Sequence, residues 1–221
     1  MSVASLHLDI LPPPHRRLWG ELGAVPVRFV LYGGTAIALQ LGHRQSIDFD
    51  YFTSTPLDAE SLYRQVPWLR EAETMRQAPG TLTVRVDRGG PVKVSFLATP
   101  TLRQLRQPLV QPDHSARLAS LLDLAGTKAS VVQQRAESKD YLDIDALIRA
   151  GVSLSLALAA GRAIFGGRFD PQSTVKALSY FGDGDLATLA PAVRENLLRA
   201  VRDVDLARLP DPGPALSGIG E

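Results

Sequence analysis

Cysteine is absent from this sequence of 221 residues. Without cysteine the chain can form no disulfide, no zinc–thiolate site and no cysteine nucleophile. The absence suits a reducing compartment, and we therefore expect a cytoplasmic location.

A long hydrophobic run is also lacking. The longest apolar candidate, Val152 to Ala160, is far shorter than the roughly 18 residues that a membrane helix needs. The segment from Met1 to Ile10 carries Asp9 and no basic stretch, which is not the pattern of a signal peptide. We expect no membrane partner.

Charge of one sign is not in excess. The 24 Lys and Arg residues nearly balance the 23 Asp and Glu residues, for a formal net charge of +1. Bulk charge therefore gives no sign of a polyanion partner, although a local basic patch remains compatible with it. The hydrophobic share of 45% and charged share of 21% are ordinary for a globular protein, and the length allows one large core or two small domains.

The beginning of the chain reads as alternating helices and strands. The prolines at 12–14 indicate the end of an extended arm, with a short helix from about His15 to Leu22. Val27 to Tyr32 is rich in β-branched and aromatic residues, which predicts a buried strand. Gly33 and Gly34 end that strand, and Thr35 is a suitable cap for a helix from Ala36 to Leu41.

The next strand carries two acids on one face. In Ser46 to Phe52, Ile47, Phe49 and Tyr51 alternate with Asp48, Asp50 and Phe52. A helix is expected over Leu57 to Leu69. The alternating runs 81–86 and 92–96, joined by the turn residues 87–91, predict a hairpin.

The second half of the chain has helical spacing and no convincing strand. We place a boundary near Leu109 to Asp113, which gives an α/β core at 1–112 and a helical domain at 113–221. The stretch from Pro210 to Glu221 is rich in Pro and Gly and is expected to be loose. The fold class is α+β, with a mixed sheet followed by a helical lobe.

The segment from Leu31 to Thr53 contains the candidate phosphate-binding and metal-binding residues. Gly33 and Gly34 allow the backbone to approach a phosphate, and the helix start after them presents N–H groups to phosphate oxygens. Asp48 and Asp50 lie about 6–7 Å apart along one strand face. Two carboxylates at that spacing can hold Mg²⁺ ions that also bind a nucleoside triphosphate.

Each of these features has an ordinary structural explanation. A Gly-Gly pair is more often a plain turn, and Asp-x-Asp is often a solvated strand face. The combination is more specific, because both acids lie on the non-core face one short helix after the glycine turn.

The segment GGTAIALQLGHRQSIDFDYF resembles the signature of the polymerase-β-like nucleotidyltransferase superfamily and, more narrowly, the AbiEii/AbiGii toxin family, which includes MenT-type toxins. The family pattern continues with a helix that carries Lys, then Arg, then a basic residue followed by Asp, and a further Asp. This chain has Lys128, Arg135, Lys139-Asp140 and Asp143. The resemblance implies a polymerase-β-like core and covers roughly Val27 to Leu209.

The second motif can also be interpreted from its spacing. On one continuous helix, Lys128, Arg135 and Lys139 would fall within about 40° of each other on an otherwise apolar stripe. Such a stripe suits a cleft that receives a triphosphate or a nucleic-acid backbone. The alternative is a helix break at Ala136 to Ser138, which would make Lys139 an ordinary surface charge.

Several neighbouring residues have expected supporting roles. Asp140 could orient Lys128 or Arg135 or serve as a third acidic group, whereas Asp143 and Asp145 could pair with Arg149 or cap locally.

His43 and Arg44 lie just before the acidic strand, where the family pattern is often basic. The resemblance implies contact there with a phosphate or with Asp48. We favour His43 as a loop residue with no role and Arg44 as support for the acidic strand, and we group Arg44 and Ser46 with the nucleotide-binding residues.

One position departs from the superfamily pattern. Many nucleotidyltransferases carry a third carboxylate on a later strand, where this chain has Ser95. Its absence could weaken a second metal site or remove a general base.

The resemblance implies an enzyme that uses Mg²⁺ or Mn²⁺ and transfers a nucleotidyl group from an NTP to an acceptor hydroxyl. Gly33, Gly34, Thr35, Asp48 and Asp50 would bind the NTP and metal, and Lys128 would neutralise the triphosphate. The implied acceptor is tRNA, and a toxin role implies a cognate antitoxin protein. The alternatives are a nucleotide- or RNA-binding module with little or no turnover, and an AMP or UMP transferase acting on protein.

Overall fold

A computed structural model describes residues 6–111, 116–216 and 218–220. The chain forms two compact units. The first, here called the sheet unit, comprises Met1–Leu102, Gln107–Ala119 and Ser217–Glu221. The second, the helical unit, comprises Arg103–Arg106 and Ser120–Leu216.

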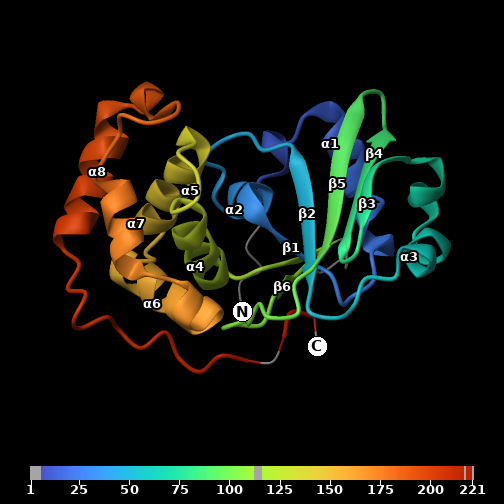
Figure 1. Ribbon diagram of the computed structural model, residues 1–221. Helices are drawn as coiled ribbons and strands as arrows, with labels where there is room; N and C mark the ends of the chain where they lie inside the picture. The colour runs from blue at the N-terminus through green and yellow to red at the C-terminus, as the bar shows by residue number, and fades with distance from the viewer. Residues whose placement is uncertain (1–5, 112–115, 217, 221) are drawn as a thin grey trace. The chain divides into compact units, whose positions relative to one another are not determined.

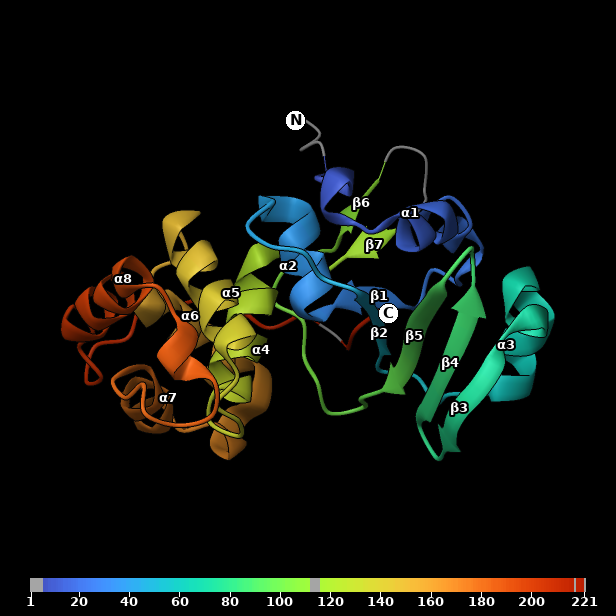
Figure 2. The ribbon, with the colours of Figure 1, turned by 90° about the horizontal axis from the view of Figure 1, so that it is seen from above.

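The sheet unit contains a seven-stranded mixed sheet in the order β3-β4-β5-β2-β1-β7-β6 (Figure 1, Figure 2). Strands β2 and β5 pair in parallel, as do β1 and β7, and the other neighbours are antiparallel. The strands are β1 (Val30–Tyr32), β2 (Asp48–Thr53), β3 (Glu73–Ala78), β4 (Thr81–Asp87), β5 (Pro91–Ala98), β6 (Leu109–Val110) and β7 (Arg117–Leu118).

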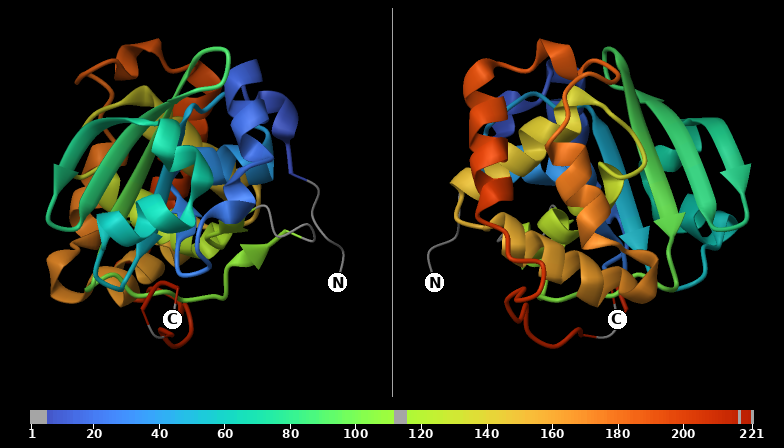
Figure 3. Two further views of the ribbon diagram at one scale, coloured as in Figure 1. Left: turned by 90° about the vertical axis from the view of Figure 1, so that its right-hand side faces the viewer. Right: turned by 60° about the vertical axis from the view of Figure 1, so that its left-hand side comes forward.

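One face of this sheet is apolar and covered by helices. Phe49 and Tyr51 of β2 are buried, as is Phe96 of β5, whose ring stacks on Tyr51 at a centroid distance of 5.6 Å. Trp19 packs on Phe49, and Trp68 packs on Phe96. Each such buried side chain contributes about 1.5–3 kcal/mol. Figure 3 shows the helical segments around α3 in front of β3–β5 in its left panel.

The helical segments of the sheet unit are short. They are η1 (Leu8–Ile10), α1 (Pro13–Trp19), η2 (Leu22–Ala24), α2 (Gly33–Leu41), α3 (Ala59–Gln65) and η3 (Pro67–Glu71). Helix α2 directly follows β1 and packs beside β2, and it ends at Gly42 in the left-handed conformation with φ 64°. A glycine adopts that conformation without a Cβ clash, so it is a suitable C-terminal stop.

The helical unit packs its helices around a separate apolar core. They are α4 (Leu121–Val131), α5 (Ser138–Arg149), α6 (Leu154–Phe165), η4 (Gly166–Arg168), α7 (Pro171–Leu178), η5 (Leu186–Thr188) and α8 (Pro191–Arg202). Tyr141, Leu158 and Leu197 belong to this core. Helices α4 and α6 approach closely at Gly126, where a Cβ atom would lie 2.9 Å from the backbone carbon of Ala160.

The sheet unit extends beyond the domain boundary that the sequence predicted. The boundary was expected near Leu109 to Asp113, and residues 112–115 of that region lie outside the described residues. After them, β7 pairs with β1 through Leu118 opposite Leu31, so residues 116–119 still belong to the sheet unit. The helical unit therefore resumes at Ser120 rather than at residue 113.

Three local predictions are also wrong. Helix α1 starts within the proline run, because proline at the first helical positions loses no hydrogen bond. Thr35 lies inside the first turn of α2, whose N-cap residue is Tyr32, so Thr35 is no cap. The tail is anchored rather than loose: Ile219 is buried, and its carbonyl accepts a 2.9 Å hydrogen bond from the Ser54 N–H.

No single helix among the described residues is long and apolar enough to cross a membrane. The stretches Ser138–Arg149 and Leu154–Arg168 meet that requirement only as a pair, with a bend of 113° between them.

Candidate active site

The two acids of β2 face away from the apolar core of the sheet unit. Phe49, Tyr51 and Thr53 are buried, whereas Asp48 and Asp50 are partly exposed, as the alternating sequence predicts. Side chains two residues apart on a strand point to the same side, so the carboxylates share one face. This face of β2 is where the chain can offer oxygen ligands to a cation.

The glycine turn lies directly beside the second acid. Strand β1 runs antiparallel to β2 with Tyr32 opposite Asp50, so Gly33 follows at the level of that carboxylate. Gly33 has φ 74°, and a Cβ atom placed on it would lie 3.4 Å from Asp50 Oδ2. Glycine therefore supplies the required backbone conformation and leaves room beside the carboxylate.

Thr35 and Ser46 fix the start of the acidic strand. The buried Thr35 hydroxyl lies 2.5 Å from the Asp48 carbonyl oxygen and 2.8 Å from the Ser46 hydroxyl. Because a carbonyl oxygen only accepts, Thr35 donates to Asp48. Both residues were expected to bind nucleotide. In the structure they tie α2 to the backbone of the first acid, which positions Asp48.

The strand β5 brings two further residues to this face, and one of them was missed by sequence reasoning. In the parallel pairing of β2 and β5, Lys93 lies opposite Asp48 and Ser95 opposite Asp50. The Lys93 ammonium is 3.4 Å from Asp48 Oδ1. Ser95 is buried, at the position where a third carboxylate was expected by analogy. The hairpin was predicted correctly, but its parallel register with β2 has no local sequence signal.

The donor set suits one small, hard cation. Mg²⁺ is commonly held by one or two carboxylates, with water and substrate phosphates completing its shell. Asp48 and Asp50 supply two carboxylates on one face. Among the residues that the structure describes, no group of three or more His, Asp or Glu side chains could hold a metal. Asp48 and Asp50 are thus the two residues that would hold a magnesium or manganese ion, and the metal itself stays a prediction.

The loop before β2 carries Arg44 and His43. Arg44 donates from Nη1 to the carbonyl of its neighbour Gln45 at 2.8 Å, which stiffens the loop. His43 is half-buried in the same loop. The roles proposed for Arg44 in phosphate contact and for His43 as a passive loop residue stay predictions.

The second motif does not lie on one continuous helix. Helix α4 ends at Val131 and α5 begins at Ser138, so the alternative of a helix break is correct. The stripe of three cations that we expected is therefore absent from the described helices. Lys139 is exposed and its ammonium lies 2.7 Å from Glu137, as for an ordinary surface charge.

Lys128 is instead at the centre of a buried ion cluster within the helical unit. Its ammonium lies 2.5 Å from Asp140 Oδ1 and 2.7 Å from Asp143 Oδ2, and its side chain is only 7% exposed. Arg135 donates from Nε to Asp140 Oδ2 at 2.7 Å. Asp140 thus orients both cations, as expected. Asp143, which was expected to pair with Arg149 or cap locally, pairs with Lys128.

Protonation in this cluster follows from its contacts. Burial acts to raise the pKa of Asp140, but the hydrogen bond from Arg135 and the charge of Lys128 outweigh it and hold the pKa below its ordinary value. The hydrogen bond to Asp140 raises the pKa of Arg135. Asp145 lies outside the cluster and pairs with Arg149 at 2.7 Å, as predicted. The role of Lys128 toward a triphosphate stays a prediction.

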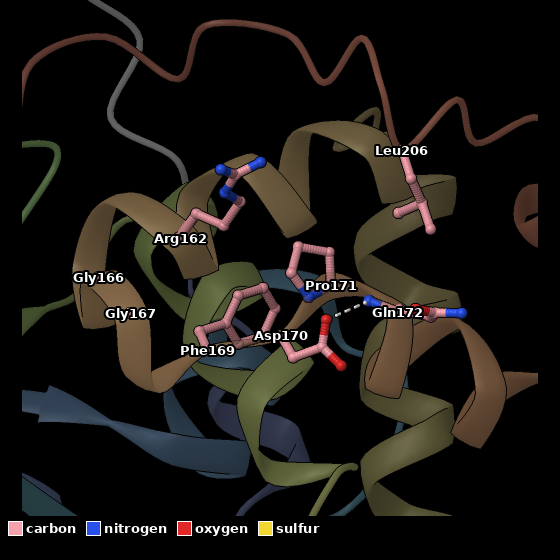
Figure 4. A pocket seen from close by; sticks show the side chains of 8 residues that line it. All are labelled: Arg162, Gly166, Gly167, Phe169, Asp170, Pro171, Gln172 and Leu206. Carbon is pink, nitrogen blue, oxygen red and sulfur yellow. Dashed lines mark hydrogen bonds between the residues drawn. The ribbon is translucent and has the colours of Figure 1, made fainter.

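A cavity of about 530 Å³ lies elsewhere in the helical unit and involves none of the predicted site residues (Figure 4). Asp170 caps helix α7 there by accepting from the N–H groups of Gln172 and Ser173. A carboxylate already occupying a helix start repels a phosphate. The cavity is lined by Arg162, Gly166, Gly167, Phe169, Asp170, Pro171, Gln172 and Leu206.

Comparison with known proteins decides the family. The model of a family described as "Nucleotidyl transferase AbiEii toxin, Type IV TA system" matches residues 18–213, which include the glycine turn, the two acids of β2 and the Lys128 cluster. The chain belongs to this AbiEii family. The family predicted from the two motifs is thereby confirmed.

Two solved structures share the fold of this AbiEii-family chain. MenT4, a nucleotidyltransferase toxin from Mycobacterium tuberculosis H37Rv, superposes with a TM-score of 0.58 at 15% identity, covering 90% of this chain and 84% of MenT4. A protein from H. pylori, described as a candidate nucleotidyltransferase, gives a TM-score of 0.52 at 16% identity, covering 84% and 88%. The predicted α+β nucleotidyltransferase fold is confirmed.

A relative in sequence is an uncharacterized protein of Aquifex aeolicus (strain VF5), which is 34% identical over 128 residues. The match covers 55% of the AbiEii-family chain and 58% of the Aquifex protein. The chain thus spans a little more than half the length of this curated relative.

Proposed function

We propose that this AbiEii-family chain transfers a nucleotidyl group from an NTP to an acceptor hydroxyl, with one divalent ion held by Asp48 and Asp50. One observation carries the proposal: both carboxylates lie on the non-core face of β2, and Asp50 lies beside Gly33. Family membership supports the same reaction class.

The chain's own residues bind and orient the nucleotide. Gly33 and Gly34 let the backbone approach the phosphates, and the first turn of α2 offers N–H groups that have no acceptor within the helix. Thr35 holds the Asp48 backbone in place. A bound Mg²⁺ or Mn²⁺ would neutralise phosphate charge and align the triphosphate.

In the reaction, the acceptor oxygen bonds to the α-phosphorus, the bond from that phosphorus to its bridging oxygen breaks, and pyrophosphate leaves. The hydroxyl proton passes to solvent water, since β5 presents Ser95 rather than a carboxylate beside Asp50. Transfer through a loose transition state depends on positioning and charge neutralisation more than on a strong base.

The acceptor and the biological role are further parts of the proposal. A toxin role is supported by the family description and by the toxin MenT4 as a structural neighbour. We propose tRNA as the acceptor, as the resemblance to MenT-type toxins implies, and a cognate antitoxin as protein partner.

A second candidate is a nucleotide- or RNA-binding module without turnover. Ser95 favours it, because a hydroxyl stands opposite Asp50, where the resemblance to the superfamily implies a third acid. The two candidates differ in whether label is transferred, not in whether nucleotide is bound.

The test is incubation of the purified chain with each [α-³²P]NTP, Mg²⁺ and total tRNA. The proposal predicts label on RNA with at least one NTP and none with a [γ-³²P]NTP, since the γ-phosphate leaves in pyrophosphate. Label on protein would mean that the acceptor is a protein and not tRNA. Nucleotide binding by calorimetry with no label on either macromolecule would favour the binding module.

A further inference from the structure

A lysine lies on the same sheet face as the two candidate metal ligands. Lys93 stands opposite Asp48 in the parallel pairing of β5 with β2, and its ammonium is 3.4 Å from Asp48 Oδ1. Directly paired residues on neighbouring strands project to the same side of a sheet, so this contact follows from the register. The side chains of Lys93 and Asp48 are 46% and 42% exposed.

The strand that flanks the acids therefore adds a positive charge and a hydroxyl. Lys93 is beside Asp48, and the buried Ser95 is beside Asp50. A second divalent ion needs additional negative ligands, because two cations held close together repel each other. Here the position that could supply one holds serine, and the position next to Asp48 already holds an ammonium.

We propose that Lys93 is a positioning residue that limits this site to a single divalent ion. The inference rests on the proposed function, because it takes Asp48 and Asp50 as the ligands. The Lys93 ammonium occupies Asp48 Oδ1 and supplies the positive charge that a second ion would otherwise bring. The other Asp48 oxygen and the Asp50 carboxylate would be the protein ligands of the one ion.

A competing cation near a ligand weakens metal binding, and its removal should strengthen it. The Lys93–Asp48 pair is half-exposed and longer than a tight charge-assisted hydrogen bond, so water and salt screen it. Replacing Lys93 by methionine keeps the length of the side chain and removes the charge. We expect Mn²⁺ to bind Lys93→Met about 3- to 10-fold more tightly at low ionic strength.

Arg85 provides a matched control for the loss of charge. It lies opposite Lys93 on β4, on the same face but one strand farther from Asp48, and it pairs with Glu73. Arg85→Met makes the same change in net charge. Its effect on the Mn²⁺ dissociation constant should stay within about twofold, because screened charges lose influence with distance.

The experiment is titration of the full chain with Mn²⁺ alone, followed by the electron paramagnetic resonance signal of unbound Mn²⁺. Wild type should bind one ion, and Asp48→Asn and Asp50→Asn should abolish that binding. Lys93→Met should bind one ion more tightly. The double variant Lys93→Met/Ser95→Asp should bind two, because it removes the cation and restores a third acid opposite Asp50.

Two ions bound to wild type would overturn the inference. So would a Lys93→Met dissociation constant within twofold of wild type, or equal gains from Arg85→Met and Lys93→Met, and each of these would leave the Asp48 and Asp50 site intact. Absence of any Mn²⁺ binding to wild type at millimolar concentration would overturn the proposed metal site itself, and the inference with it.

Discussion

At the scale of single residues, the candidate site depends on what stands beside each carboxylate. Asp50 has Gly33 next to it, and Asp48 has the Lys93 ammonium beside its side chain and the Thr35 hydroxyl on its carbonyl. The neighbours of each acid come from different elements, namely β1–α2 and β5. A substitution at a neighbour of one acid can therefore change the contacts of that acid and leave those of the other acid intact.

Gly33→Ala tests the space beside Asp50. The substitution forces a non-glycine residue to φ 74°, which costs about 1–3 kcal/mol, and places Cβ 3.4 Å from Asp50 Oδ2. We expect a lower urea midpoint together with a transfer rate reduced at least tenfold.

Gly151→Ala is the matched control. Gly151 has φ 96°, and nothing lies within 4 Å of a Cβ placed there. This variant should lose stability similarly and keep its transfer rate per folded molecule. Equal loss of activity in both variants would show that backbone strain, not the space beside Asp50, is responsible.

At the scale of elements, the Lys128 cluster joins two helices within the helical unit. Lys128 is near the end of α4, and both of its carboxylate partners are on α5. A buried charge lowers the free energy of unfolding unless an opposite charge pairs with it. Removal of one partner therefore destabilises the fold by leaving the other charges buried and unpaired. The cluster therefore determines how well α4 and α5 stay packed.

Lys128→Met should destabilise the helical unit by about 3–5 kcal/mol, because Asp140 and Asp143 lose the ammonium between them. Thermal and urea unfolding measure this loss. Lys139→Met is the control from the same motif. Lys139 is exposed and pairs with Glu137 at the surface, so its loss should cost less than about 1 kcal/mol. Comparable costs for the two variants would contradict the assignment of Lys128 as the buried centre.

Asp140→Asn tests the same cluster through pH. The folded-state pKa of Asp140 lies below its unfolded value, so its contribution to stability is present above the unfolded pKa and is lost as pH falls through the folded pKa. Wild type should lose more stability than Asp140→Asn between about pH 5 and pH 2. Urea midpoints measured across that range give the difference. Parallel curves would show that Asp140 does not titrate below its ordinary range.

In each protein, Asp123 has an effect on the pH dependence of stability that is opposite to the effect of Asp140. Burial raises the pKa of Asp123, so its titration favours the folded state as pH falls. Asp123 is present in both proteins, and its effect cancels when the two curves are subtracted.

At the scale of the whole molecule, the chain joins two compact units with separate cores, and each unit carries one of the two motifs. The family match extends over both, at residues 18–213. Ile219 near the end of the chain packs into the sheet unit, where its side chain is buried and its carbonyl accepts a hydrogen bond from the Ser54 N–H. The first motif can thus be tested for metal binding, and the second for stability, by independent measurements.

Local patterns predicted the elements whose two faces differ. The strand β2 was predictable because Phe49 and Tyr51 alternate with acids at the strand period. The edge strand β3 was missed because its side chains, such as Thr74 and Arg76, are exposed on both faces and show no periodicity. The break between α4 and α5 was missed as a first choice because residues 132–137 contain neither proline nor glycine.

The site was predictable only in part, for a related reason. Asp48, Asp50 and Gly33 lie close together in sequence, so their proximity follows from one strand–turn–helix–strand segment. Lys93 reaches Asp48 through a parallel strand pairing that no nearby residue specifies. Lys128 contacts Asp140 and Asp143 across a break between two helices, and the sequence spacing did not specify that contact.

The most direct test of the central claim is transfer from [α-³²P]NTP to tRNA by wild type, Asp48→Asn, Asp50→Asn and the control Glu60→Gln. Glu60 is an exposed carboxylate of the same unit that pairs with Arg64 four residues later, so its variant makes a similar chemical change away from β2. The account predicts transfer by wild type and Glu60→Gln. It predicts a loss of at least 1,000-fold, about 4 kcal/mol of transition-state stabilisation, in each aspartate variant. The thermal midpoints of both aspartate variants should stay close to that of wild type, because less repulsion between the two carboxylates offsets the loss of the half-exposed Lys93 pair in Asp48→Asn. Undiminished transfer by either folded aspartate variant would contradict the account.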